Sequence, residues 1–135
     1  GGEPSGTWLH PDFCMCPDGI LSGLRMAEIV SRDGKLSELL DAIPSYPNIR
    51  EKITCSAEAK IRVMENMEEL LTDAFDDISE VNSIDGVRLS FEDDSWVLVR
   101  PSGTEDYIRI TLESRDADRA EEIKEICVKI INENL

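Results

Sequence analysis

The chain has 135 residues, of which 41% are hydrophobic and 32% are charged, a composition typical of a globular protein rather than a disordered one. With a formal net charge of −15, the chain lacks the cationic surface that binds nucleic acids and anionic membranes, so we expect neither as a partner. No apolar run approaches the roughly 20 residues of a membrane span, and no secretion signal is visible.

The four cysteines, Cys14, Cys16, Cys55 and Cys127, do not form the two spaced pairs that a structural zinc site requires. Free cysteines of cytoplasmic proteins are usually reduced and mostly buried, and we expect the same state and location here. The chain does not begin with Met, and we therefore expect a piece of a longer protein.

A Gly- and Pro-rich start gives way to helical periodicity in the first third of the chain. Asp18 is a candidate helix cap and Gly34 a candidate helix stop. In chain order we expect a loop with a short extended piece at 1–13, helices at 17–34 and 35–43, and a Pro-containing linker at 44–48. Residues 1–43 would then supply helices but no sheet of their own, like the end of a domain whose sheet lies elsewhere.

After residue 48, alternation with a period of two marks strands, and a period of 3.6 residues marks helices. The alternation is clearest where Ile108, Ile110 and Leu112 share one face. Ser56 is a candidate cap for the long central helix, and Asp118 begins what resembles a capping box for the last one. The expected elements are strands at 49–55, 86–91, 96–100 and 107–113, and helices at 57–75 and 116–135. They predict an α+β domain, a four-stranded sheet with two helices on one face.

The stretch RPSGTED, at 100–106, joins two of these predicted strands and combines small residues with hydroxyl groups. Such a turn can present several backbone N–H groups in one direction, and clusters of this kind bind anions. Arg100 precedes the turn and Arg109 projects from the polar face of the next strand, where a guanidinium group suits phosphate oxygens. The alternative is a tight turn whose arginines pair with nearby carboxylates. The lysine and the spacing of a nucleotide-binding P-loop are absent.

The opening GGEPSGT is a permissive loop, in which Glu3 and Ser5 point the same way if the segment is extended. A carboxylate and a hydroxyl group at this spacing suit the hydroxyl groups of a sugar, and the alternative is a disordered terminus. His10, the sole histidine, is a candidate base or anion contact, with a structural or exposed role as the alternative. The acidic clusters at 76–77 and 92–94 lack the pattern of a calcium loop, so we expect solvated side chains and no metal site.

Taken together and in this order, GGEPSG at 1–6, PDGIL at 17–21 and RPSGTED at 100–106 resemble the α-D-phosphohexomutase family, which includes phosphoglucomutase, phosphomannomutase and phosphoglucosamine mutase. The resemblance covers the whole chain. Most similar members have Pro where this chain has Asp106, and many bacterial members have His where it has Thr7. Asp at this position also occurs in phosphoacetylglucosamine mutases, which leaves the sugar open between glucosamine, mannose and glucose.

The resemblance implies a C-terminal fragment of a four-domain enzyme, with the end of the third domain at 1–43, a linker at 44–48 and the phosphate-binding fourth domain at 49–135. Such an enzyme interconverts a hexose 1-phosphate and its 6-phosphate through a bound hexose 1,6-bisphosphate. The implied phosphate contacts are Arg100, Ser102, Gly103, Thr104 and Arg109, and the implied sugar contacts are Glu3 and Ser5.

In that family a phosphoserine in the first domain donates the phosphoryl group, and an aspartate-rich loop in the second domain holds Mg²⁺. Neither motif occurs here, so the resemblance implies no catalytic residue and no metal ligand in this chain, and no activity of the chain alone. Its implied partners are the phosphosugar and the remaining domains of the parent chain. An apolar helix face within 1–43 would be exposed, which predicts self-association as a consequence of truncation. Two other hypotheses stay open, a stand-alone phosphosugar-binding module and an interaction domain whose turn binds no ligand.

Overall fold

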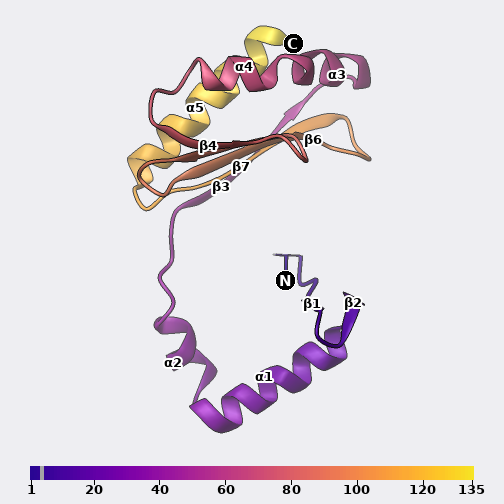
Figure 1. Cartoon of the computed structure of the whole chain (residues 1–135), viewed down its shortest axis with the longest axis vertical. Coiled ribbons are helices and arrows are strands. Elements are labelled where there is room, and N and C mark those ends of the chain that lie inside the picture. The colour runs from indigo at the N-terminus through magenta and orange to yellow at the C-terminus, as the bar shows by residue number, and fades with distance from the viewer. Residues whose placement is uncertain (4) are drawn as a thin grey trace. The chain divides into compact units, whose positions relative to one another are not determined.

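The computed structural model of the chain describes residues 1–3 and 5–135. The chain separates into two compact units, Gly1–Ser45 and Tyr46–Leu135 (Figure 1). Each unit contains a sheet. Among the described helices, none combines the length and the apolar character that crossing a membrane demands.

The first unit consists of a small antiparallel sheet and two helices. Its elements are β1 (Leu9–His10), β2 (Cys14–Pro17), α1 (Gly19–Asp33) and α2 (Leu36–Asp41). The expectation of no sheet in this region is wrong, because the chain turns back on itself and pairs His10 with Cys14. The Asp18 carboxylate caps α1 as predicted by accepting a hydrogen bond from the Leu21 N–H at 2.8 Å. Gly34 ends the helix with a φ of 112°.

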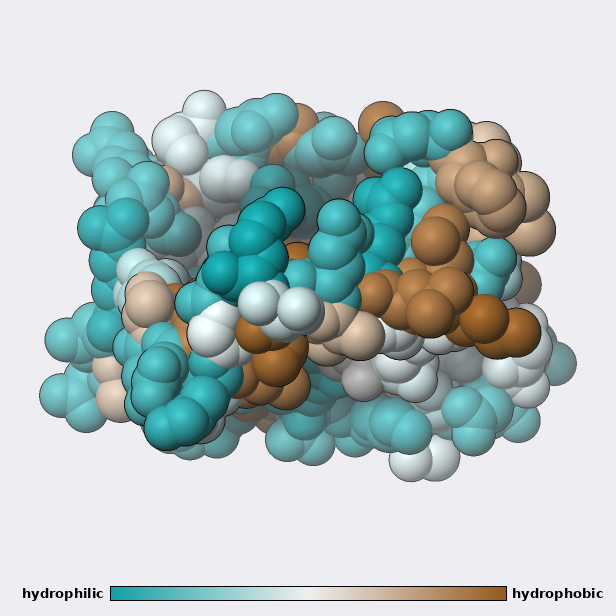
Figure 2. All heavy atoms as spheres, turned by 90° about the horizontal axis from the view of Figure 1, so that it is seen from below, coloured by the Kyte–Doolittle hydropathy of each residue, from teal (hydrophilic) through white to brown (hydrophobic). Residues whose placement is uncertain are grey.

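The helices of the first unit have no buried side chains. On α1, Ile20 is 82% exposed and Leu24 is 64% exposed. Brown apolar surface is visible among the teal polar groups in the space-filling view (Figure 2). Helices in water are stabilised mainly by packing an apolar face against another element. Within the described part of the chain, however, every buried hydrophobic residue belongs to the second unit.

The second unit is a five-stranded antiparallel sheet with its helices on one face (Figure 1). Across the sheet the strands are β3 (Asn48–Thr54), β7 (Tyr107–Glu113), β6 (Trp96–Pro101), β5 (Val87–Phe91) and β4 (Ile78–Asn82). The helices are α3 (Ala57–Glu65), α4 (Met67–Thr72) and α5 (Ala117–Asn134). The predicted α+β class is confirmed, with five strands instead of the four expected.

Two elements of this unit differ from the sequence-based expectation. The unexpected strand, β4, lies at the edge of the sheet and is mostly exposed, so its sequence lacks the apolar alternation of a half-buried strand. The long helix expected at 57–75 is interrupted at Asn66, whose φ of −112° and ψ of 8° leave the helical region. The interruption begins a new helix, and Met67 and Leu71 of that helix are fully buried.

The core lies between the sheet and the helices. As the alternation predicts, Ile108, Ile110 and Leu112 of β7 are fully buried. The buried side chains of α5 are Ala120, Ile123, Cys127 and Ile131. Burying one such side chain stabilises the folded state by about 1.5–3 kcal/mol, and the second unit therefore has the core that the first unit lacks.

The start of α5 also differs in detail from the prediction. The cap is Asp116 rather than Asp118, because the Asp116 carboxylate accepts hydrogen bonds from the N–H groups of Asp118 at 2.8 Å and of Arg119 at 3.0 Å. The cap of α3 is as predicted, since Ser56 Oγ accepts a hydrogen bond from the Ala59 N–H.

Candidate functional site

The predicted anion-binding stretch, residues 100–106, begins at the end of β6, and its loop, residues 101–106, leads to the start of β7. It borders a pocket of about 460 Å³, here called the loop pocket. The pocket is lined by Asp85, Arg100, Pro101, Ser102, Gly103, Thr104, Glu105, Tyr107 and Arg109. All five residues that the resemblance implies for phosphate binding therefore surround one cavity.

The loop offers hydrogen-bond donors to this pocket. The N–H groups of Gly103 and Thr104 have no acceptor within the described residues. A Cβ atom at Gly103 would meet nothing within 4 Å, so a ligand can approach the backbone closely there. Ser102 Oγ accepts a hydrogen bond from the Glu105 N–H at 3.1 Å, which leaves the Ser102 hydroxyl proton available for donation. A concave group of donors of this kind suits an anion.

Arg100, at the end of β6, is paired with a carboxylate that the sequence analysis did not identify. Its Nη1 atom donates to Oδ2 of Asp85, in the turn between β4 and β5, at 2.8 Å. Gly86 follows with a φ of 81°, and a Cβ atom there would lie only 2.6 Å from the Cβ of Arg100. Glycine at this position therefore lets the turn approach Arg100 closely. In the sequence, the dipeptide Asp85-Gly86 before an alternating run indicates the turn between β4 and β5. It does not indicate that Asp85 pairs with Arg100.

Three cations form a row across neighbouring strands on the sheet face opposite the core. Lys52 of β3 lies directly opposite Arg109 of β7, and Arg109 lies directly opposite Arg100 of β6. Tyr107 lies between two of them, with Lys52 Nζ 4.6 Å and Arg109 Cζ 5.4 Å from the ring centroid. Arg109 Nη2 also donates to the Tyr107 hydroxyl at 2.5 Å. Like charges directly opposite each other are unfavourable, so an anion in the loop pocket would relieve the repulsion.

The predicted sugar-binding residues Glu3 and Ser5 lie together in the first unit. The Glu3 N–H donates to the Thr7 carbonyl at 2.8 Å, and the Gly6 N–H donates to the Glu3 carbonyl at 3.0 Å. The Ser5 hydroxyl lies 3.2 Å both from a carboxylate oxygen of Glu3 and from the hydroxyl of Thr7. The two side chains therefore point the same way, with a carboxylate and a hydroxyl group side by side. Pro4 of this motif lies outside the described residues.

His10 has a structural contact. Its Nε2 atom lies 2.8 Å from the Ser22 hydroxyl, which in turn donates to the Asp18 carbonyl at 2.7 Å. The imidazole is therefore attached to the first turn of α1. This geometry fits the structural alternative for His10.

The cysteines are free thiols, but the expectation that most are buried is wrong. Cys127 alone is buried, and this burial raises the pKa of its thiol to about 12. Cys16 is exposed on β2, with its Sγ atom 2.9 Å from Sγ of Cys14. The hydrogen bond from Cys16 lowers the pKa of the Cys14 thiol.

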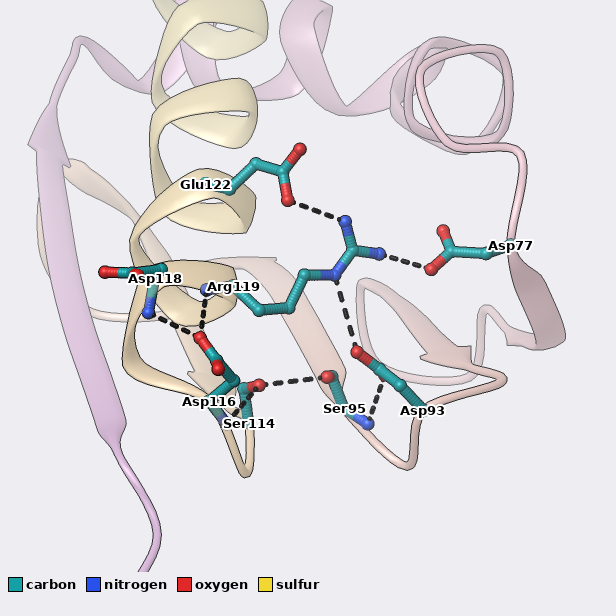
Figure 3. Close-up of polar contacts among 8 residues, drawn as sticks. All are labelled: Asp77, Asp93, Ser95, Ser114, Asp116, Asp118, Arg119 and Glu122. Atoms are coloured by element: carbon teal, nitrogen blue, oxygen red, sulfur yellow. Dashed lines mark hydrogen bonds and ion pairs between the residues drawn. The ribbon is translucent and has the colours of Figure 1, made fainter.

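The acidic clusters are mostly exposed, as expected, but Asp77 and Asp93 also pair with a cation of the protein itself. Arg119 of α5 is paired with Asp77, just before β4, with Asp93 in the turn between β5 and β6, and with Glu122 of its own helix (Figure 3). Its guanidinium carbon also lies 5.1 Å from the centroid of the Phe91 ring. Within the described part of the chain, no group of three or more His, Cys, Asp and Glu side chains is placed to hold a metal ion.

Comparison with known proteins relates both units to one family. The family model "Phosphoglucomutase/phosphomannomutase, C-terminal domain" matches residues 53–130, and the model "Phosphoglucomutase/phosphomannomutase, alpha/beta/alpha domain III" matches residues 1–46. A solved structure, a phosphoglucomutase/phosphomannomutase family protein from Burkholderia thailandensis, superimposes with a TM-score of 0.70 at 24% identity. The superposition covers 89% of this chain and 24% of that one, and it supports the fold.

The chain is also similar along its whole length to curated archaeal proteins. It is 82% identical over 135 residues to the "Probable phosphoglucosamine mutase" of Methanobrevibacter smithii, covering 100% of this chain and 30% of the relative. It is 47% identical over 136 residues to the "Phosphoglucosamine mutase" of Methanococcus aeolicus, covering 100% of this chain and 29% of the relative. The chain thus spans less than a third of the length of these relatives. With a family model matched over more than half of its residues, the chain belongs to the phosphoglucomutase/phosphomannomutase family, the phosphohexomutases that its motifs resemble.

Proposed function

We propose that this chain is the substrate-binding C-terminal part of a phosphohexomutase, in which it holds one phosphate of a hexose bisphosphate while the other phosphate reacts. The observation that carries the proposal is the loop pocket, where two arginines and free backbone donors converge. The proposed phosphate contacts are Arg100, Ser102, Gly103, Thr104 and Arg109. They neutralise charge and orient the ligand, and they form no covalent bond with it.

The sugar of the same ligand would contact Glu3 and Ser5, which present a carboxylate and a hydroxyl group side by side. We propose the domain boundaries 1–43 for the sugar-binding part, 44–48 for the linker and 49–135 for the phosphate-binding part. The reaction is the interconversion of a hexose 1-phosphate and its 6-phosphate, with the hexose 1,6-bisphosphate as the bound intermediate.

We further propose that the phosphoryl-donating serine and the Mg²⁺ of the reaction belong to other domains of the parent enzyme, and that this chain alone binds without catalysing. The described residues of the chain do not fit a Mg²⁺ site, since they contain no suitable group of ligands. The names of the relatives favour glucosamine phosphates as the substrate class over mannose or glucose phosphates. A cytoplasmic location fits a phosphosugar substrate and the free thiols.

The first test is a titration of the chain with glucose 1,6-bisphosphate at low salt, followed by NMR of the backbone amides. Arg100→Ala should weaken binding roughly tenfold or more, because a charge-assisted contact to phosphate is lost. Arg115→Ala is the matched control, since Arg115 also forms an exposed ion pair, with Asp94 at 2.9 Å, but lies outside the loop pocket. Binding to Arg115→Ala should stay within about twofold of the wild type.

Two outcomes would contradict the proposal. If the wild-type chain shows no amide shifts at 100–109, the turn binds no phosphosugar and the interaction-domain hypothesis is favoured. If shifts occur but Arg100→Ala and Arg115→Ala bind equally well, the ligand lies elsewhere. If the isolated chain both binds the bisphosphate and shows mutase activity, the proposed site is favoured. The proposal that catalysis requires the other domains of the parent enzyme is then refuted.

A further inference from the structure

A single ammonium group connects the loop at 101–106 to the helical layer of the second unit. Lys60 of α3 donates from Nζ to the Ser102 carbonyl at 2.8 Å and to the Glu105 carbonyl at 2.9 Å. These contacts join residues 42 and 45 positions apart in the sequence. Lys60 therefore attaches to the loop at two peptide groups, near its start and near its end.

The ammonium group of Lys60 has no acidic partner. Within the described residues, no carboxylate lies within ion-pairing distance of its Nζ atom. Lysine side chains at protein surfaces usually keep the ammonium group in water or beside an acid. Here two of its three donors are used by backbone carbonyl groups of the loop, so its positive charge is added to the loop without being cancelled.

Because a peptide group is planar, fixing its carbonyl group also fixes the direction of its N–H group. In a trans peptide the C=O and N–H groups point in opposite directions, and no cis peptide bond occurs in the described residues. When the Ser102 carbonyl points at Lys60, the Gly103 N–H must point away from Lys60. The same relation holds for the Glu105 carbonyl and the Asp106 N–H. Both N–H groups lack an acceptor within the described residues.

The helix side of the loop is hollow beside Lys60. A second pocket of about 530 Å³ lies on the helix side of the loop, and it is lined by Lys60, Ile61, Met64, Glu65, Pro101, Ser102 and Gly103. Without the ammonium group, the Ser102 carbonyl would be left unpaired beside this largely apolar space, which is costly, whereas the Glu105 carbonyl would keep the hydrogen bond that it accepts from the Tyr107 N–H at 3.0 Å. The Ser102–Gly103 peptide group would then rotate, and the Gly103 N–H would rotate with it.

We propose that Lys60 is a positioning residue for phosphate binding: its ammonium group holds the Ser102–Gly103 peptide so that the Gly103 N–H faces the anion, and its contact with the Glu105 carbonyl holds the other end of the loop. Lys60 does not touch the ligand and acts through the loop. The inference rests on the proposed function of the loop pocket, and it adds a residue that the motif at 100–106 does not contain.

The test compares Lys60→Met, Lys60→Arg and Lys129→Met in the full 135-residue chain, with inorganic phosphate as the probe. Lys129 is an exposed lysine of α5 whose nearest acid, Glu133, is 3.9 Å away, so its removal changes the net charge equally without touching the loop. Phosphate should bind to Lys60→Met roughly tenfold more weakly than to the wild type, and to Lys129→Met within about twofold. Lys60→Arg, which keeps both charge and donors, should recover most of the affinity.

A second measurement distinguishes an effect of Lys60 on the position of the loop from an effect on the stability of the second unit. Without ligand, the ¹⁵N relaxation of Gly103 and Glu105 should show increased motion in Lys60→Met, while the thermal midpoint of the second unit stays close to that of the wild type. Equal phosphate affinity in Lys60→Met and wild type, or equal weakening in Lys60→Met and Lys129→Met, would overturn the role of Lys60 and leave the loop pocket intact. A wild-type chain that binds no phosphate would instead overturn the proposed function itself, and the role of Lys60 with it.

Discussion

Asp85 and Arg100 form an ion pair inside the loop pocket, and the pair has a consequence for ligand binding. The Arg100 side chain is 40% exposed and that of Asp85 is 72% exposed, so the pair itself stabilises the fold by less than about 1 kcal/mol. The Asp85 carboxylate, however, lies 2.8 Å from the Nη1 atom that a phosphate would use. If the loop pocket binds phosphate as proposed, Asp85 competes with that anion for Arg100.

Replacing Asp85 by Asn should accordingly strengthen phosphate binding. We expect the dissociation constant of inorganic phosphate to fall roughly two- to fivefold at low salt, because an exposed charge competing for Arg100 is removed. Asp94→Asn, which removes the partner of Arg115, is the control and should leave the constant unchanged. Weaker binding in Asp85→Asn would mean that Asp85 assists the ligand, and the competition argument would be abandoned. Calorimetric titration measures all three chains.

At the scale of elements, Arg119 connects three segments that meet at one end of the sheet. From the first turn of α5 it reaches Asp77 before β4 and Asp93 in the turn between β5 and β6 (Figure 3). Its side chain is only 19% exposed, so these ion pairs are less screened than those at the surface. Burial alone would raise the pKa of Asp93, but hydrogen bonds from Ser95 and the charge of Arg119 lower it below its ordinary value of 3.8.

Arg119→Met should therefore lower the free energy of unfolding by about 1 kcal/mol, since partly exposed carboxylates lose a partner that is itself only 19% exposed. A carboxyl group whose pKa is lowered in the folded state stabilises the fold above its unfolded pKa, and this contribution is lost as the pH falls. The difference between wild type and variant should thus shrink as the pH is lowered below 3.8. Urea denaturation at pH 7 and pH 3 measures it, and Arg32→Met, which removes an ion pair with the neighbouring Asp33, is the control. A loss that is independent of pH would point to packing on Phe91 instead.

At the scale of the whole molecule, the two units differ in how their apolar residues are covered. The second unit buries its apolar residues between sheet and helices, whereas α1 and α2 of the first unit bury none. Exposed apolar surface of this extent is a typical site of association. In the parent enzyme we expect the remaining part of the third domain to cover it.

The chain alone should therefore self-associate through residues 1–43. Sedimentation velocity should give a mass that rises with concentration above the 15.1 kDa of the monomer. The double variant Ile20→Gln, Leu24→Gln should shift this equilibrium toward the monomer. The control is Ile84→Gln, because Ile84 is 90% exposed but lies in the second unit. A wild-type chain that stays monomeric at all concentrations would refute the prediction, and so would an equal effect of the control.

The periodicity of the sequence by itself determined most of the local structure of the second unit. Alternation placed Ile108, Ile110 and Leu112 on the core face and Arg109 on the opposite face, because successive side chains of a strand point to opposite sides. Cap residues such as Asp18 and Ser56 could be predicted from the sequence because a cap interacts with N–H groups only a few positions away. RPSGTED could be identified as a candidate anion-binding loop for the same reason, since its donors are contiguous in the chain.

Only the tertiary structure decided which distant side chains surround that loop. Lys60 reaches the loop from α3, Asp85 reaches Arg100 from another turn, and Asp77 and Asp93 meet at Arg119. The edge strand β4 could not be predicted from the sequence either, because an exposed strand needs no apolar alternation and is held by hydrogen bonds to the backbone of its neighbour. Local patterns reflect the geometry of a single element, whereas these contacts depend on how the strands and helices are ordered in space. The sequence therefore determined which residues form the loop of the candidate phosphate site, and the fold determined which distant charged side chains contact that loop and Arg100.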